Sequence, residues 1–180
     1  ATTSTTAIPH RGKKFRLRGA IKTAVNEGQG QMWLRIDLED KKVGFFDNMD
    51  SRPIKASAWK EYEITGTVDQ NATNILFGAF LSGKGKLWVD KFTLEIETDG
   101  VWKTIPIANP SFEEDTEPKK WYTGSPGYIY TITDEAFEGK RALLINDNST
   151  SKIAEVLFKE KPVFGDYVMK SLGNGISCIV

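Results

Sequence analysis

The stretch ILFGAFLSGKGKLWVDKFTLEI, residues 75–96, contains two apolar segments that flank a glycine-rich segment. Residues 75–81 are almost continuously apolar, which is typical of a strand covered on both faces. Residues 82–86 (SGKGK) supply the glycines that a tight turn needs for positive φ. Residues 87–96 predict a second strand, with one face formed by Trp88, Asp90, Phe92, Leu94 and Ile96 and the other by the residues between them. The stretch therefore predicts a β-hairpin at the centre of the fold.

The remaining sequence up to residue 150 predicts short strands separated by polar turns, and no helix. Residues 1–7 are β-prone, residues 26–30 are expected to form a loop, and residues 47–53 (DNMDSRP) a polar loop. Strands are expected at residues 15–22, 32–37, 43–46, 61–68, 101–107, 128–133 and 142–145. Short strands at regular spacing favour an all-β fold, an antiparallel β-sandwich.

The composition sets limits on the class of protein. Of 180 residues, 39% are apolar, including 5 Trp and 10 Phe, which is enough to build a core. Lys and Arg together number 24, as do Asp and Glu, so the chain lacks the basic character of a nucleic-acid binder. The sequence contains no apolar run of the length that a membrane span needs. The single cysteine, Cys178, excludes an intrachain disulfide.

Four ordered motifs resemble a known kind of module: MWLRID (32–37), FFDNMDSRPI (45–54), WKEYEITGTV (59–68) and FGAFLSGKGKLWVDKFTLEI (77–96). Together they resemble a bacterial jelly-roll module, similar to carbohydrate-binding modules of the galactose-binding-like type. Such modules are found beside tail-specific (C-terminal-processing) serine peptidases, beside erythromycin-esterase-like enzymes and on some regulators. The resemblance implies a jelly-roll sandwich in an exported bacterial protein, periplasmic, extracellular or in the cell envelope.

The resemblance also divides the chain into three parts. Residues 1–98 correspond to the main part of the sandwich, and residues 99–150 contain a segment like the opening of such a module (NPSFE, W, GY, GKRALLI). Residues 151–180 resemble a lead-in to a peptidase domain, which would be the partner of the module in the same polypeptide. Because the closing strands precede the opening ones, two alternatives stay open. Either residues 109–145 complete the first sandwich in permuted order, or they begin a second module.

Two acidic residues are candidates for a structural Ca²⁺ site. Asp90 is a carboxylate in a row of large apolar side chains, and a buried charge must be paired or metal-bound. In modules of the type that the chain resembles, carboxylates at the positions of Asp90 and Glu113 often hold Ca²⁺. A second Asp usually follows the first, but Lys91 stands there in this chain. The alternative is that Asp90 accepts hydrogen bonds from backbone N–H groups or pairs with a lysine.

A row of alternating residues on one expected strand is the candidate ligand site. An aromatic ring can stack on the apolar face of a sugar while flanking polar groups hold its hydroxyls. The alternative is a solvated sheet face whose neighbouring loop is held by ion pairs. The candidate residues are Trp33, Arg35 and Asp37, beside Asp47, Asn48 and Arg52.

The sequence does not predict a catalytic site. His10 is the one histidine, in a turn that also contains Pro9, and no nucleophile-elbow motif is present. We therefore expect a non-catalytic accessory module of a bacterial serine peptidase, used for positioning or for contact with another protein. The alternative is a carbohydrate-binding module that uses the Trp33–Arg35–Asp37 face. A third hypothesis, a hydrolase fragment, would require residues after Val180.

Overall fold

The structure is a computed structural model that describes residues 1–114, 120–148, 169–171 and 177–179, without the side chains of residue 26 and of the last two segments. The chain divides into two compact units, Ala1–Ser149 and Thr150–Val180. In the second unit, β9 (Met169–Ser171) pairs antiparallel with β10 (Ser177–Ile179). The rest of the expected lead-in at 151–180 lies outside the described residues.

Two long antiparallel strands form the centre of the first unit. β2 (Lys14–Leu38) and β5 (Ala72–Thr98) pair from Phe15 opposite Ile96 to Leu38 opposite Ala72. The predicted hairpin turn at 82–86 is therefore wrong, and so is the predicted loop at 26–30. These two segments lie opposite each other in one continuous two-stranded ribbon, with Gly28 facing Gly83.

Glycines allow this ribbon to bend while its strands stay paired. Gly83 and Gly85 have φ values of 89° and 131°, which side chains rarely tolerate. A Cβ atom at Gly83 would lie 2.1 Å from the backbone oxygen of Glu27, and one at Gly28 equally close to that of Ser82. A shift of register between Val25 and Glu27 adds a β-bulge, which increases the local bend. The glycines of residues 82–86, which were predicted to close a turn, thus allow a bend in a paired ribbon.

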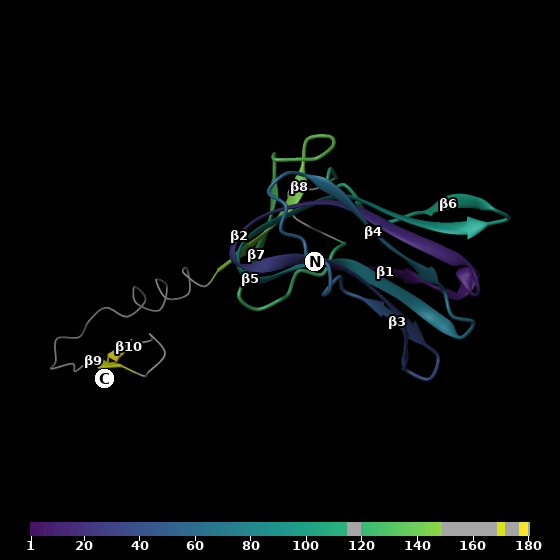
Figure 1. The fold of residues 1–180 in the computed structure, drawn as a ribbon, viewed down its shortest axis with the longest axis horizontal. Coiled ribbons are helices and arrows are strands. Elements are labelled where there is room, and N and C mark those ends of the chain that lie inside the picture. Colours follow the sequence, from purple (N-terminus) through teal and green to yellow (C-terminus); the bar gives the residue numbers. More distant parts are fainter. Residues whose placement is uncertain (115–119, 149–168, 172–176, 180) are drawn as a thin grey trace. The chain divides into compact units, whose positions relative to one another are not determined.

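Each half of the ribbon pairs with its own set of further strands, and the two sets form the two layers of the sandwich (Figure 1). All pairs are antiparallel, so the predicted all-β antiparallel sandwich is confirmed. One layer contains the first half of β2, the second half of β5, and β4 (Lys60–Thr67), β6 (Val101–Ile105), β7 (Tyr128–Thr133) and β8 (Ala142–Asp147). The other contains the remaining halves with β1 (Thr2–Thr6) and β3 (Val43–Asp47), and a short 3-10 helix, η1 (Ile8–His10), follows β1.

The core between the layers includes the side chains of Phe112 and Trp121. Phe77 and Phe92 are each 1% exposed, and their ring centroids lie 6.2 Å apart. The ring centroid of Trp121 lies 5.1 Å from that of Phe92 and 5.2 Å from that of Phe112. The Nε1 of Trp121 donates a hydrogen bond to the carbonyl oxygen of Ala108 at 3.1 Å. The described residues between 109 and 145 therefore belong to the same compact unit as residues 1–98, and β8 lies beside β5.

A bulge in β5 changes which residues face the core. Lys91 has a φ of 50°, and the register with β2 shifts between Arg18 and Ala20. Leu87 and Val89 face the core before the bulge, and the alternate residues do so after it, at Phe92, Leu94 and Ile96. The expectation that Trp88 and Asp90 share a face with Phe92 is therefore wrong.

The described residues form no helix with the length and apolar character needed to cross a membrane.

Candidate ligand-binding site

The predicted row on β2 lies on the outer face of the layer that contains β1 and β3. Trp33, Arg35 and Asp37 are partly exposed there. They alternate with the fully buried side chains of Met32, Leu34 and Ile36. The alternation seen in the sequence is thus present, but two separate cavities divide the row between them.

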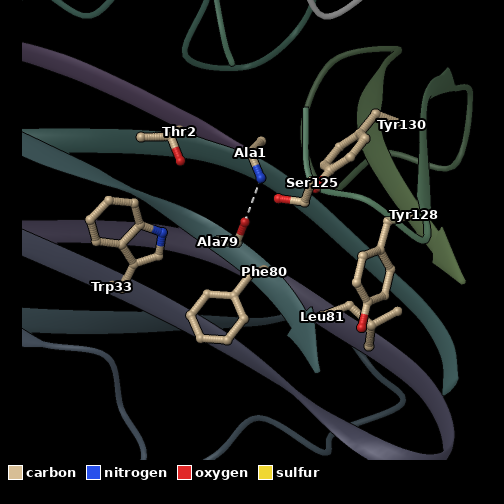
Figure 2. Close-up of a pocket in the computed structure, with 9 residues that line it drawn as sticks. All are labelled: Ala1, Thr2, Trp33, Ala79, Phe80, Leu81, Ser125, Tyr128 and Tyr130. Carbon is tan, nitrogen blue, oxygen red and sulfur yellow. Dashed lines mark hydrogen bonds between the residues drawn. The ribbon is translucent and has the colours of Figure 1, made fainter. Parts of the chain in front are cut away.

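The first cavity, which we call the Trp33 cavity, has a volume of about 320 Å³ and four aromatic side chains in its wall. Trp33 comes from β2 and Phe80 from the neighbouring β5, while Tyr128 and Tyr130 come from β7. Figure 2 shows Trp33 and Phe80 toward the left of the view and the two tyrosines toward the right. The other lining residues are Ala1, Thr2, Ala79, Leu81 and Ser125.

Polar groups lie at the edge of the Trp33 cavity. The hydroxyl group of Tyr128 accepts a hydrogen bond from the Gly83 N–H at 3.2 Å and donates one to the Gly83 carbonyl oxygen at 3.3 Å. The amino group of Ala1 donates to the carbonyl oxygen of Ala79 at 2.6 Å (Figure 2). An aromatic wall with a few convergent polar groups is typical of a small-ligand site.

A second cavity, of about 340 Å³, lies farther along the same strand and is more polar. The Arg35 guanidinium donates from Nη2 to Oδ2 of Asp37 at 3.1 Å, and its Nε lies 2.8 Å from Oδ1. Both side chains stay about one third exposed, so their remaining donors and acceptors are open to a ligand. The cavity is completed by Leu38, Lys41, Val43, Thr73 and Asn74.

Neither of these cavities is lined by the other three candidates, Asp47, Asn48 and Arg52. Their contacts stabilise the loop that follows β3. Asp47 forms a two-contact ion pair with Arg52, at 2.5 and 3.2 Å, and accepts a hydrogen bond from the Met49 N–H. The carbonyl oxygen of Asn48 accepts a hydrogen bond from Gln31 at 3.0 Å. Partial burial alone would raise the pKa of Asp47, but Arg52 and the Met49 N–H outweigh it and hold this pKa below its ordinary value.

Asp90 and Glu113 hold one loop from its two ends. Asp90 is fully buried and accepts from the N–H groups of Phe137 (2.9 Å), Glu138 (3.0 Å) and Lys91 (2.6 Å). Oε1 of Glu113 accepts from the N–H groups of residues 140 and 141, at 2.7 and 2.9 Å. Between these contacts lies Gly139, where a Cβ atom would lie 2.3 Å from Oε1 of Glu113.

The pKa shifts of these two carboxyl groups run in opposite directions. Burial raises the pKa of Asp90 above its ordinary value, opposed by its three N–H donors and reinforced by the charge of Glu113. The N–H groups of Lys140 and Arg141 hold the pKa of Glu113 below its ordinary value. Relative to water, the folded protein thus favours the ionised form of Glu113, whereas at Asp90 the effect of burial outweighs that of the three N–H donors.

The donor set around Asp90 and Glu113 does not fit the implied Ca²⁺ well. Ca²⁺ takes about 6–8 oxygen ligands, but the carboxylate oxygens that face residues 137–141 already accept backbone N–H groups. Within the described part of the chain, no group of three or more His, Cys, Asp or Glu residues could hold a metal ion.

Sequence reasoning missed most of the Trp33 cavity. Phe80 lies in a segment that is predicted to be covered on both faces, and Tyr128 and Tyr130 lie far along the chain. Their alternation in residues 128–133 predicts that they share one face of a strand. That face lies near Trp33 only because β7 pairs with β8, which in turn pairs with β5.

Comparisons with known proteins give one relative by sequence and two similar structures. The relative is the uncharacterized HTH-type transcriptional regulator YbfP of Bacillus subtilis (strain 168), 35% identical over 117 residues, which span 59% of this chain and 39% of the regulator. No family model matches the sequence. The chain thus spans well under half the length of the curated relative it matches.

The two similar structures come from Xyn10C of Paenibacillus barcinonensis. The CBM22-1 xylan-binding domain has a TM-score of 0.39 and 11% identity, over 52% of this chain and 62% of that one. The N-terminal CBM22-1–CBM22-2 tandem domain has a TM-score of 0.40 and 11% identity, over 78% of this chain and 44% of that one.

Proposed function

We propose that this chain is a non-catalytic accessory module of a larger protein, and that its ligand occupies the Trp33 cavity. The observation that supports this proposal is the convergence of four aromatic side chains from three strands on one cavity: Trp33, Phe80, Tyr128 and Tyr130. Aromatic rings bury large areas at low entropic cost and dominate the free energy of many interfaces. The module holds its parent protein on a partner through this cavity.

The accessory role is supported by two independent likenesses. The ordered motifs at residues 32–96 resemble modules beside peptidases, beside esterase-like enzymes and on regulators. The stretch that matches YbfP covers 39% of that regulator, so a similar segment occurs within a longer protein. Because these motifs resemble modules found beside serine peptidases, we propose that the parent protein is an exported bacterial serine peptidase. Its peptidase domain would be a partner of this module. Cleavage of an unfolded substrate by this chain alone would contradict the non-catalytic role.

The experiment compares Trp33→Ala with Arg52→Ala in binding titrations against panels of oligosaccharides and extended peptides. Arg52 is the matched control, because it lies on the following loop and pairs with Asp47 without lining the cavity. Trp33→Ala is expected to weaken binding at least roughly tenfold, equivalent to about 1.4 kcal/mol. Arg52→Ala is expected to leave the affinity unchanged. Equal affinities of the two variants for every ligand found would contradict the proposed site.

A carbohydrate ligand along the outer face is the second candidate, and the second cavity favours it. Arg35, Asp37 and Asn74 offer donors and acceptors on the same strand pair as Trp33, so a chain of sugars could stack on the ring and hydrogen-bond farther along. A glycan array tests this candidate. Retention that is lost in both Trp33→Ala and Asp37→Ala, but kept in Arg52→Ala, would support it.

A further inference from the structure

The second cavity carries an excess of positive charge. Its wall contains three ionisable side chains, those of Arg35, Asp37 and Lys41. The Arg35 guanidinium and the Asp37 carboxylate approach to 2.8 Å, so their charges compensate each other. Lys41, by contrast, forms no ion pair with any of the residues that the structure describes. The cavity therefore keeps one positive charge that this part of the chain leaves uncompensated.

The acidic residues next to Lys41 in the chain already have partners. Glu39 pairs with Arg11 at 2.6 Å, and Asp40 pairs with Lys42 at 2.7 Å. Neither acidic residue lines the cavity. An acidic group on a ligand would therefore compensate Lys41 without breaking an existing pair, and hydrogen bonds between charged groups are stronger than neutral ones.

The backbone that carries Lys41 is held in place by the turn between β2 and β3. The Leu38 N–H donates to the carbonyl oxygen of Lys42 at 2.9 Å, and the Lys41 N–H donates to that of Leu38 at 3.1 Å. The Asp40 carboxylate also accepts from the Lys42 N–H at 3.1 Å. Because the backbone is already ordered, a ligand has to order only the side chain of Lys41, which limits the entropic cost of binding.

The strands beneath this cavity are paired along both edges. Arg35 on β2 lies between Phe46 of β3 and Leu76 of β5. Asn74 on β5 likewise lies between β2 and β1. Strand addition by a peptide needs an unpaired edge, which these positions do not offer. A ligand on this face is therefore recognised by side chains.

The side chains in the wall offer donors, acceptors and one apolar contact. Arg35 and Lys41 are donors only, the Asp37 carboxylate is an acceptor, and the Asn74 amide is both. Val43, which is 53% exposed, supplies an apolar surface. A sugar acid matches this set, because it has a carboxylate for the cations, hydroxyls for Asp37 and Asn74, and C–H groups for Val43. A neutral sugar would leave Lys41 uncompensated.

We propose that the second cavity binds an acidic sugar, a uronic acid unit of a glycan, with its carboxylate on Lys41 and Arg35. Asp37 and Asn74 then bind the hydroxyls of the same sugar. Trp33 lies two residues before Arg35 on the same outer face, so a neighbouring sugar of the glycan can stack on its ring. The proposal rests on the carbohydrate alternative of the proposed function, and it specifies the charge of the glycan.

The test titrates the chain with an oligogalacturonate and with its methyl ester, which keeps the hydroxyls but loses the charge. Lys41→Gln is compared with Lys103→Gln, the matched control, because Lys103 is also exposed but lies on β6 in the other layer. Lys41→Gln is expected to weaken binding of the acid form at least roughly tenfold, whereas Lys103→Gln leaves it unchanged. The ester is expected to bind more weakly and equally to both variants. Affinity for the acid form should also fall with added salt.

Four outcomes would overturn the acidic-sugar proposal. They are equal binding of the acid and the ester, equal affinity of the two lysine variants for the acid, no binding of the acid up to its solubility limit, and binding of a pentaglutamate peptide instead of the uronate. Binding that is lost in Trp33→Ala but depends on neither Lys41 nor the ligand's charge would contradict this inference and spare the proposed function. Binding of the acid that is lost in Lys41→Gln and kept in Trp33→Ala would spare this inference and contradict the Trp33 cavity as the ligand site.

Discussion

Phe77 and Phe92 belong to the same strand, β5, yet their rings face each other across the core with centroids 6.2 Å apart. This is possible because β5 bends at its glycine-rich segment and enters the second layer of the sandwich. The packing of the core and the bend of the ribbon are therefore one structural property. Changes at either place should affect the stability of the whole first unit.

Replacing Phe92 with alanine should lower the free energy of unfolding by about 3–5 kcal/mol, because its ring contacts those of both Phe77 and Trp121. Urea denaturation followed by fluorescence measures this change. Phe46→Ala is the control, because Phe46 is 57% exposed, and it should change stability by no more than about 0.5 kcal/mol. A similar loss of unfolding free energy in the two variants would mean that the aromatic cluster does not stabilise the core more than an exposed ring does.

Gly83→Ala should destabilise the protein more than Gly100→Ala, although both glycines have positive φ, of 89° and 75°. Alanine at positive φ costs about 1–2 kcal/mol in either position. At Gly83 the new Cβ atom would also meet the Glu27 backbone oxygen at 2.1 Å, whereas nothing lies within 4 Å at Gly100. Thermal unfolding of the two variants isolates the cost of this contact. Equal Tm values would contradict the close pairing of the ribbon at its bend.

The difference between a hairpin and a bent ribbon could not be predicted from the sequence, because both need glycines at the same places. The alternation of Met32, Leu34 and Ile36 with Trp33, Arg35 and Asp37 was enough to predict a half-buried strand. The SGKGK segment looks the same whether it closes a turn or faces Gly28 in a second strand. Only the pairing of distant segments decides between them.

The candidate site shows the same limit. Trp33, Arg35 and Asp37 were predictable as one face of a strand, since side chains alternate with a period of two. The cavity depends on Tyr128 and Tyr130, which reach it because β8 docks on β5. Asp90 could be identified as an unusual buried charge, but its donors at 137 and 138 lie on a loop that no local pattern connects to it.

Ca²⁺ and EDTA should each leave the Tm of the protein unchanged, because backbone N–H groups occupy the carboxylate oxygens that a cation would use. Differential scanning calorimetry with either additive measures this. A ligand that binds only the native state at about 100 times its Kd adds about 2.7 kcal/mol of stability, which such a scan resolves readily. A rise of Tm with Ca²⁺ that is lost in Glu113→Gln would instead support the metal implied by the resemblance.

Asp90→Asn should lower the free energy of unfolding by about 1–3 kcal/mol at neutral pH. An asparagine has one acceptor oxygen, so at least one of the three N–H groups that Asp90 accepts would face an NH₂ group instead. Hydrogen exchange should show faster opening at residues 137 and 138. Asp50→Asn, at an exposed position in the loop that follows β3, is the control and should change neither quantity.

Glu95→Gln should remove part of the loss of stability that the protein shows in acid. Arg16 donates to this carboxylate at 2.6 and 3.0 Å and Arg18 at 2.7 Å. The hydrogen bond from Arg16, followed by the charges of both arginines, holds the pKa of Glu95 below its ordinary value of 4.5 although burial opposes this. Because the native pKa is the lower one, the stabilisation is complete well above pH 4.5 and is lost as the pH falls through the native pKa.

The two proteins should therefore differ most at neutral pH, and the difference in their free energies of unfolding should shrink as the pH falls below the ordinary value of 4.5. Urea titrations at several pH values measure this difference. Glu39→Gln is the matched control, because Glu39 pairs with Arg11 at an exposed position and such pairs contribute at most about 1 kcal/mol. A constant difference between Glu95→Gln and the unmodified chain across the acid range would show that the paired charge of Glu95 is not what acid removes.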